Sequence, residues 1–160
     1  MSWITAGAGA RLLEQSTDLA IEVHAGTLPQ LFDMAALVTM AMQCLSLPLD
    51  GGDGEAARVS LRSELEGLGG RVPARELDLA GHDSGALLVH WLRELNYLLE
   101  AERFVYTGAT FRELGPTLGA DVTGVRARGA PLRELKGVTY HELAVSPVGD
   151  EWVARISYDL

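Results

Sequence analysis

The sequence predicts an α+β fold, in which a mostly antiparallel β-sheet carries two packed α-helices. Two stretches, roughly 28–47 and 85–101, repeat apolar residues at helical spacing. Most of the remaining chain alternates apolar and polar residues, which is the period of a half-buried strand. After the second helix, strand-like segments follow one another with short glycine and proline breaks, as in antiparallel hairpins. We expect the 160 residues to form one domain.

The first third of the chain predicts strands and then a helix. One or two strands are expected within 11–25, where Leu19, Ile21 and Val23 alternate with less apolar residues. The segment Thr27-Leu28-Pro29-Gln30 is a capping box, with threonine at the N-cap and glutamine three residues later. It predicts the start of the first helix, which ends before a glycine-rich turn.

The next segment, Arg58–Glu66, is predicted as a strand. Val59, Leu61 and Leu65 fall on one side of such a strand, and Ser63 is the exception. The residues that follow, up to Gly81, predict loop or a weak strand.

A second helix is expected roughly from Gly85 to Ala101, capped by Asp83 or Ser84. A wide apolar stripe supports it, made of Leu88, Trp91, Leu92, Leu95 and Leu99. Strand segments are then expected at 104–106, 110–114, 120–128, 135–145 and 151–158. The residues Pro147-Val148-Gly149-Asp150 predict a hairpin connection between the last two.

The charge of the chain bears on the kind of partner it can have. The formal net charge is -9 and the sequence pI is about 4.8. Binding to a phosphate backbone draws on clustered lysine and arginine, and the chain has no basic run. Tight, direct nucleic-acid binding is therefore not expected. An acidic protein of this kind is suited to dock on a basic partner or to collect cations.

The single cysteine, Cys44, excludes an internal disulfide and fits a reducing compartment. It stands in an apolar helical stretch, which favours a buried, unreactive thiol. The first residues show no signal-peptide pattern, and no apolar run reaches the ~18 residues of a membrane span. We therefore expect a cytoplasmic protein with no membrane partner.

Lys136 is the only lysine, and every other basic side chain is arginine. An ammonium is a compact point charge that arginine does not replace. His141 follows five residues later on a predicted strand, and an odd offset places the two on opposite faces of a regular strand. They can act together only if a bulge intervenes. Either residue alone would ordinarily be a solvated or satisfied side chain.

Two carboxylates are expected at the end of the last predicted strand. The Asp159 side chain and the α-carboxylate of Leu160 stand side by side there. Together with a third carboxylate from another strand end they would form a hard-oxygen site of the kind that Ca²⁺ or Mg²⁺ prefers. The alternative is a strand that simply stops. Asp18 opens a strand after a Ser-Thr pair, where a turn or capping role is the ordinary explanation.

The sequence contains no complete catalytic constellation. It lacks a Gly-x-Ser-x-Gly elbow, a Gly-x-x-x-x-Gly-Lys phosphate loop and a Cys-x-x-Cys pair, and its histidines lack zinc-site spacing. This favours a protein that is not an enzyme. A small metal-dependent hydrolase is the weakest alternative, because no nucleophile or base is visible.

Three separated segments resemble the archease family. Residues 136–143 (Lys-Gly-Val-Thr-Tyr-His-Glu-Leu), with the terminal Asp159-Leu160, resemble its C-terminal signature. Residues 87–95 (Leu-Leu-Val-His-Trp-Leu-Arg-Glu-Leu) are similar to its second-helix motif. Residues 16–21, followed by Gly-Thr-Leu at 26–28, resemble its N-terminal His-Thr-Ala-Asp motif and the start of its first helix.

The resemblance implies the archease fold and a non-catalytic partner of the RtcB-type RNA ligase, which serves tRNA splicing and RNA repair. Archeases promote guanylylation of that ligase and let it turn over repeatedly. Carried over to this chain, the family's metal ligands fall on Asp18, Asp159 and Leu160, and its functional lysine falls on Lys136. The implied cofactor is a divalent cation of the Ca²⁺ or Mg²⁺ type. We consider His141, which lies within the C-terminal signature, as a candidate accessory residue.

The chain departs from the family pattern at three positions. Gln15 stands where the N-terminal motif has histidine, Gly137 where the signature has alanine, and Arg93 where the second-helix motif has asparagine. The acidic ligands are retained. The resemblance also carries an alternative function, a chaperone-like protein that binds RNA-modifying enzymes. Activation at substoichiometric amounts would distinguish an activator from a protein that prevents aggregation of unrelated clients.

Overall fold

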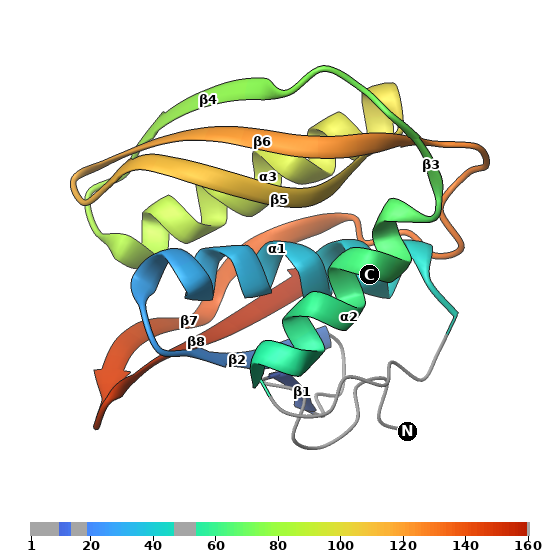
Figure 1. Cartoon of the computed structure of the whole chain (residues 1–160). Coiled ribbons are helices and arrows are strands. Elements are labelled where there is room, and N and C mark those ends of the chain that lie inside the picture. Colours follow the sequence, from blue (N-terminus) through green and yellow to red (C-terminus); the bar gives the residue numbers. More distant parts are fainter. Residues whose placement is uncertain (1–9, 14–18, 47–53, 160) are drawn as a thin grey trace.

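Two antiparallel β-sheets enclose a layer of helices in the computed structural model, which describes residues 10–13, 19–46 and 54–159 (Figure 1). The first sheet has the strand order β1-β2-β8-β7, with β1 at Ala10–Leu13, β2 at Leu19–Ala25, β7 at Gly137–Val148 and β8 at Glu151–Asp159. In the second sheet, β6 (Thr117–Ala127) pairs with each of the other three strands. These are β3 at Gly69–Arg71, β4 at Arg75–Ala80 and β5 at Phe104–Leu114. All pairings between the described strands are antiparallel.

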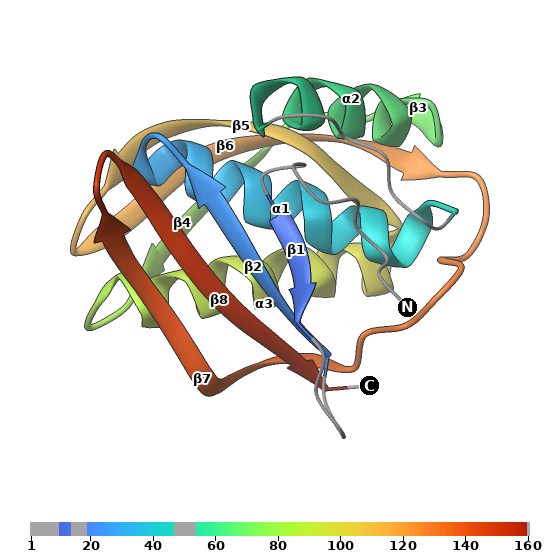
Figure 2. The same ribbon diagram turned by 90° about the horizontal axis from the view of Figure 1, so that it is seen from below.

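The helices are α1 (Leu28–Cys44), α2 (Gly54–Glu66) and α3 (Ser84–Glu102). Seen from below, the first sheet lies across α1 and α3, while α2 lies at the flank beside β5 (Figure 2). The α+β class and the antiparallel pairing are confirmed. The expectation of two helices is wrong, because the structure has a third. None of the described helices is long and apolar enough to cross a membrane.

Helix α1 is buried on all sides, and every residue from Leu31 to Cys44 is buried. It packs against β2 and β8 of the first sheet and against β5 of the second, which is the position expected for a helix with little polar surface. Its start is the predicted one. The Thr27 hydroxyl accepts a hydrogen bond from the Gln30 backbone N–H at 3.3 Å, and Pro29 occupies the first turn.

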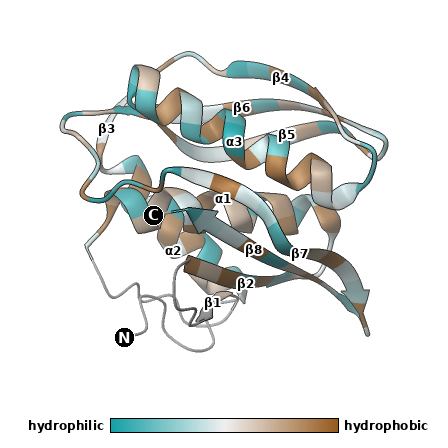
Figure 3. Cartoon of the chain, turned by 180° about the vertical axis from the view of Figure 1, so that it is seen from behind, coloured by the Kyte–Doolittle hydropathy of each residue, from teal (hydrophilic) through white to brown (hydrophobic). Residues whose placement is uncertain are grey.

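Helix α3 begins where the sequence predicts, with the Asp83 carboxylate accepting a hydrogen bond from the Ala86 N–H at 2.7 Å. It ends at Arg103, which adopts a left-handed conformation with φ 55°. Viewed from behind, α3 shows hydrophilic and hydrophobic residues in alternating patches, in agreement with one buried and one outward side (Figure 3). Its apolar stripe, including Trp91 and Leu95, is fully buried.

The segment 58–66, predicted as a strand, is part of helix α2. Its buried residues are Ala57, Leu61 and Leu65, at steps of four, and they pack against α1 and β5. Leu61 and Leu65 are also an even number of residues apart, so they fit the strand period as well. The observation that separates the two periods is Val59, whose side chain is 55% exposed. Ser63, the exception to the strand alternation, is also exposed. It lies four residues after Val59, on the same outward face of α2.

Two further corrections concern the strands. The weak strand between residues 67 and 81 is two strands, β3 and β4, both paired with β6. The two segments 104–106 and 110–114 are one continuous strand, β5, whose register shifts twice against β6. The predicted hairpin at 147–150 is confirmed, with Gly149 in the left-handed region at φ 61°.

Strand β7 contains a large bulge opposite β8. Between the pairs Thr139–Ser157 and Ala144–Arg155, β7 advances five residues while β8 advances two. Within this bulge Glu142 has φ 51°, a left-handed conformation that is uncommon for a residue other than glycine. The regular alternation of faces along 136–145, assumed from the sequence, is therefore interrupted.

Candidate functional site

Lys136 lies immediately before β7, next to the end of β8. Its backbone N–H donates a hydrogen bond to the Asp159 carbonyl oxygen at 2.9 Å, and Gly137 pairs with Asp159 across the ladder. The Lys136 side chain is exposed, and it makes no ion pair with any carboxylate among the described residues. The structure thus brings the lone ammonium and one predicted cation ligand to the same end of the first sheet.

The Asp159 side chain is exposed, and no described residue donates a hydrogen bond to its carboxylate. A Cβ atom placed on Gly137 would lie 4.0 Å from Asp159 Oδ2, which is an ordinary contact distance. Glycine and the family's alanine would therefore both leave this carboxylate accessible. This departure from the family pattern has no steric consequence for the Asp159 carboxylate.

The other predicted cation ligands, Asp18 and Leu160, lie outside the described residues. The described residue that follows Asp18 is Leu19, and it pairs with Tyr158 at the end of β8. Across the described ranges, no three His, Cys, Asp or Glu side chains are grouped closely enough to hold a metal ion. The three-ligand site predicted from the sequence therefore remains a prediction.

The end of β8 is anchored to the central helix by a buried hydrogen bond. The Thr39 hydroxyl donates to the Ala35 carbonyl oxygen at 2.7 Å and lies 2.7 Å from the Tyr158 hydroxyl. Since the Thr39 proton is already engaged, Tyr158 donates to Thr39 Oγ1. Complete burial raises the pKa of Tyr158, so the phenol stays protonated and keeps this bond. The backbone next to Asp159 is thereby held in place.

His141 lies within the β7 bulge and is exposed. Its backbone N–H donates to the Thr139 hydroxyl at 3.2 Å. Among the described residues no hydrogen bond or ion pair joins the side chains of His141 and Lys136. The structure does not assemble these two residues into a pair.

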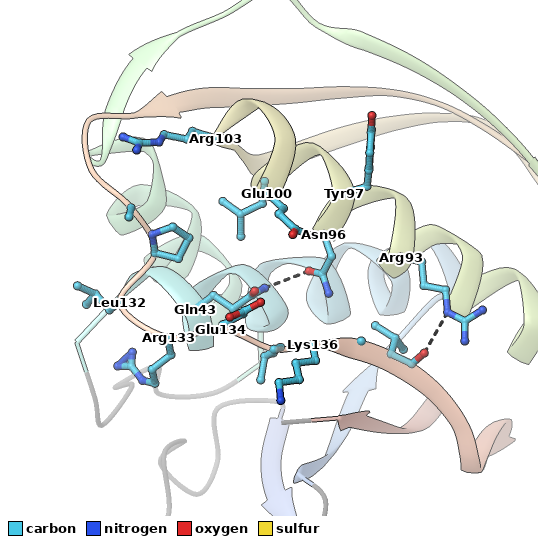
Figure 4. Close-up of a pocket in the computed structure, with 16 residues that line it drawn as sticks. Gln43, Arg93, Asn96, Tyr97, Glu100, Arg103, Leu132, Arg133, Glu134 and Lys136 are labelled. Carbon is cyan, nitrogen blue, oxygen red and sulfur yellow. Dashed lines mark hydrogen bonds between the residues drawn. The ribbon is translucent and has the colours of Figure 1, made fainter.

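A groove beside Lys136 was missed by sequence reasoning. It has a volume of about 500 Å³ and lies between α3 and the linker that joins β6 to β7, residues 128–136 (Figure 4). Its members come from three parts of the chain far apart in sequence, including Gln43, Asn96 and Leu132. The one sequence signal was Arg93, which departs from the family pattern and lines this groove.

Arg93 connects α3 to the start of β7. Its Nε–H donates to the Val138 carbonyl oxygen at 3.0 Å, and its guanidinium lies 5.1 Å from the centre of the Tyr140 ring. The Tyr140 hydroxyl in turn lies 3.0 Å from His90 Nε2, and His90 Nδ1 lies 2.7 Å from the Ala80 carbonyl oxygen. These contacts fix the strand that follows Lys136 against the helix.

Cys44 confirms the expectation of a buried thiol. Burial raises the pKa of its thiol from the ordinary 9.0 to about 11, although the nearby positive charge of Arg133 acts to lower it. The unfolded chain loses this proton near pH 9, whereas the folded chain keeps it until about pH 11. The contribution of Cys44 to stability is therefore fully present below pH 9 and is lost between pH 9 and 11.

We expect Cys44→Ala to remove that part of the pH dependence, at most about 1.4 kcal/mol per pH unit. Urea denaturation of both proteins across this pH range measures the difference. Alkylation gives an independent readout, because the thiolate is the reactive form. If iodoacetamide modified Cys44 of the native protein at neutral pH as fast as it modifies a free thiol, the raised pKa would be wrong.

Comparison with known proteins gives the family. The model of the archease protein family matches residues 11–160. Protein archease of Methanosarcina acetivorans is 28% identical over 156 residues, covering 92% of this chain and 93% of that protein. Protein archease of Methanopyrus kandleri is 33% identical over 93 residues, covering 53% of this chain and 66% of its own length.

Two solved structures share the fold. The solution structure of a Methanobacterium thermoautotrophicum protein has a TM-score of 0.67 at 20% identity, covering 96% of this chain and 99% of its own. The crystal structure from Thermotoga maritima, described as an archease and "possible chaperone", has a TM-score of 0.55 at 16% identity, covering 92% and 94%. Since the family model also spans nearly the whole sequence, this chain belongs to the archease family.

Proposed function

We propose that this protein is a non-catalytic activator of an RtcB-type RNA ligase, whose guanylylation and multiple turnover it promotes. The observation that carries the proposal is the hydrogen bond from the Lys136 N–H to the Asp159 carbonyl. It joins two separated parts of the family signature at one exposed end of the first sheet. A surface of this kind, where an exposed lysine and an exposed aspartate are joined through their backbones, suits contact with a partner enzyme better than chemistry of its own.

In this proposal Asp18, Asp159 and the Leu160 carboxylate hold a divalent cation of the Ca²⁺ or Mg²⁺ type. The donor set fits, because such ions take carboxylate oxygens. Two observations support it: the Asp159 carboxylate is exposed and accepts no hydrogen bond from a described residue, and Leu19 pairs with Tyr158. A bound divalent cation supplies positive charge that attracts phosphate or carboxylate oxygens of a partner.

Lys136 would act beside this site as a second positive group. Its exposed ammonium has no carboxylate partner among the described residues and is available to a phosphate or an acidic side chain of the ligase. In Figure 4 its side chain points away from α3. The chain as a whole is acidic, with a net charge of -9, and this favours docking on a basic, RNA-binding enzyme.

The first test is multiple-turnover RNA joining by the cognate ligase. We expect the wild-type protein to raise the number of joined products per ligase when it is present in substoichiometric amounts. Lys136→Ala should reduce this activation at least about tenfold, because an interfacial charge pair is lost. Arg71→Ala, which removes an exposed cation from β3, is the matched control and should activate normally.

If Lys136→Ala activated the ligase fully, Lys136 would have no part in the activation. Failure of the wild-type protein to activate the ligase would contradict the proposed function itself.

The cation site is tested separately by calorimetric titration with Ca²⁺ and Mg²⁺. Asp159→Asn should weaken binding while leaving the thermal midpoint of unfolding nearly unchanged, because the side chain is exposed.

A chaperone-like role is the second candidate, favoured by the description of the Thermotoga maritima protein as a "possible chaperone". The two candidates differ in stoichiometry and specificity. An activator works at low ratios on one enzyme. A protein that protects clients suppresses the aggregation of unrelated enzymes at near-equimolar amounts, which light scattering of heated clients would measure.

A further inference from the structure

We infer that the groove between α3 and the linker is a second recognition surface, and that it takes an acidic peptide segment of a protein partner with apolar side chains between its carboxylates. We call it the α3–linker groove, formed by α3 residues 93–103 and by residues 130–138, with Gln43 between them. The inference goes beyond the proposed activation, because it assigns a peptide ligand to a groove that shares only Lys136 with the surface proposed to contact the ligase.

The walls of the α3–linker groove are held by hydrogen bonds before any ligand arrives. The Gln43 carbonyl oxygen accepts the backbone N–H groups of Leu132 and Arg133 at 2.8 and 3.1 Å. The Arg133 guanidinium donates twice to the Leu45 carbonyl oxygen, at 3.0 and 2.7 Å. The Gln43 side chain donates to Asn96 Oδ1 at 3.0 Å and so joins the linker side to α3. A preformed site loses little entropy on binding.

The groove is locally cationic on an acidic protein. Its lining contains four cationic side chains, Arg93, Arg103, Arg133 and Lys136, against the two carboxylates of Glu100 and Glu134. Among the described residues none of the four makes an ion pair. Arg112 on β5, in contrast, lies within 3.6 Å of three carboxylates, those of Glu76, Asp78 and Asp121. An acidic segment would find its complement here and repulsion over most of the remaining surface.

Exposed apolar side chains stand on both walls. Tyr97 on α3 is 60% exposed and Leu132 on the linker is 61% exposed. They are two of the five large apolar side chains that the described part of the chain exposes, and Tyr140, a third, lies under Arg93 at one end of the groove. Tyrosine and arginine are enriched at the centres of protein interfaces. This composition favours a protein ligand.

The arrangement of the charges disfavours a single phosphate. Figure 4 shows Arg103 and Arg133 toward one end of the groove and Arg93 at the other, with Glu100 and Glu134 between them. A phosphate group needs donors that converge on one point, and the two glutamates would also repel the backbone of a nucleic acid. A peptide can place carboxylates at the separated cations and apolar side chains between them.

The test is an NMR titration of the labelled full-length protein with a short synthetic peptide in which Asp and Glu alternate with Leu and Phe. The neutral twin, with Asn and Gln in place of the acidic residues, is the matched ligand control. We expect the acidic peptide to shift the amide signals of Tyr97, Glu100 and Leu132. Added salt should weaken its binding, because exposed charges are screened.

Two variants locate the site without disturbing its walls. Arg103→Gln and Tyr97→Ser change exposed side chains for which no described hydrogen bond is lost, and each should weaken peptide binding about tenfold. Arg71→Gln, an exposed arginine on β3, should bind as the wild type does. Lys136 is left intact in all of them, so that ligase activation through Lys136 is not altered.

Four outcomes would overturn the inference. These are no shifts in the groove, equal binding of the neutral twin, saturation of the same amides by inorganic phosphate or single-stranded RNA, and unchanged affinity in Arg103→Gln. Because no ligase is present in this experiment, its failure leaves the proposed activation standing. Failure of the RNA-joining assay, conversely, leaves the peptide result intact.

Discussion

Replacing Asp33 with alanine is expected to lower the free energy of unfolding by about 3 kcal/mol. Asp33 lies on α1 and is 5% exposed. Its carboxylate accepts hydrogen bonds from the Tyr106 hydroxyl and the Arg62 guanidinium, both at 2.6 Å, and lies 3.4 Å from Arg58. Without it, a buried hydroxyl and two guanidinium groups lose their shared acceptor. Because Arg62 is one third exposed, the effect lies at the lower end for a buried ion pair.

Urea denaturation measures this loss, and two variants serve as controls. Asp33→Asn keeps an acceptor for Tyr106 but removes the charge, so it should fall between wild type and alanine. Glu55→Ala breaks an exposed pair with Arg58 on the same helix and should cost less than about 1 kcal/mol. If Asp33→Ala lowered the free energy of unfolding no more than Glu55→Ala does, the Asp33 carboxylate would not be the group that holds α2 against the core.

The second large effect is expected for Trp91→Ala, at about 4 kcal/mol. Trp91 is fully buried, and its Nε1–H donates to the Phe32 carbonyl oxygen at 3.0 Å. Its ring meets Tyr106 edge-on, with 5.6 Å between the ring centres, and Phe111 at 5.4 Å. The residue joins α3 to α1 and to β5, so its removal opens a cavity where three elements meet.

Trp91→Phe separates the packing from the hydrogen bond. It keeps an aromatic ring but leaves the Phe32 carbonyl without its donor, and should cost about half as much as the alanine variant. Thermal and urea unfolding of both variants give the comparison. Equal losses for phenylalanine and alanine would show that the hydrogen bond, and not the volume of the ring, dominates.

Local signals in the sequence predicted the elements whose causes are local. The Thr27 cap, the Asp83 cap and the hairpin at Gly149 depend on residues within a few positions of one another, and all three are present. Helix α2 was misread because Leu61 and Leu65 satisfy both the strand and the helix period. What decides between the periods is burial against α1 and β5, and burial depends on the whole fold.

The contact between Lys136 and Asp159 could not be predicted from the sequence, for a similar reason. Their contact follows from the register between β7 and β8, and the β7 bulge sets that register. No glycine or proline marks the residues of the bulge between Thr139 and Ala144. The α3–linker groove depends in the same way on three distant segments, which composition and periodicity cannot bring together.

The strand order of the first sheet has a consequence for how the protein is made. Strand β8, at 151–159, lies between β2 and β7. These two strands therefore cannot be joined in one sheet until β8 has left the ribosome. Until then β2 lacks the partner on that side, and α1 lacks part of its cover. Pairing across such a long stretch of chain is slow to form. A nascent chain interrupted before β8 would lack Asp159, the neighbour of Lys136, so the signature surface forms only after β8 has been synthesised.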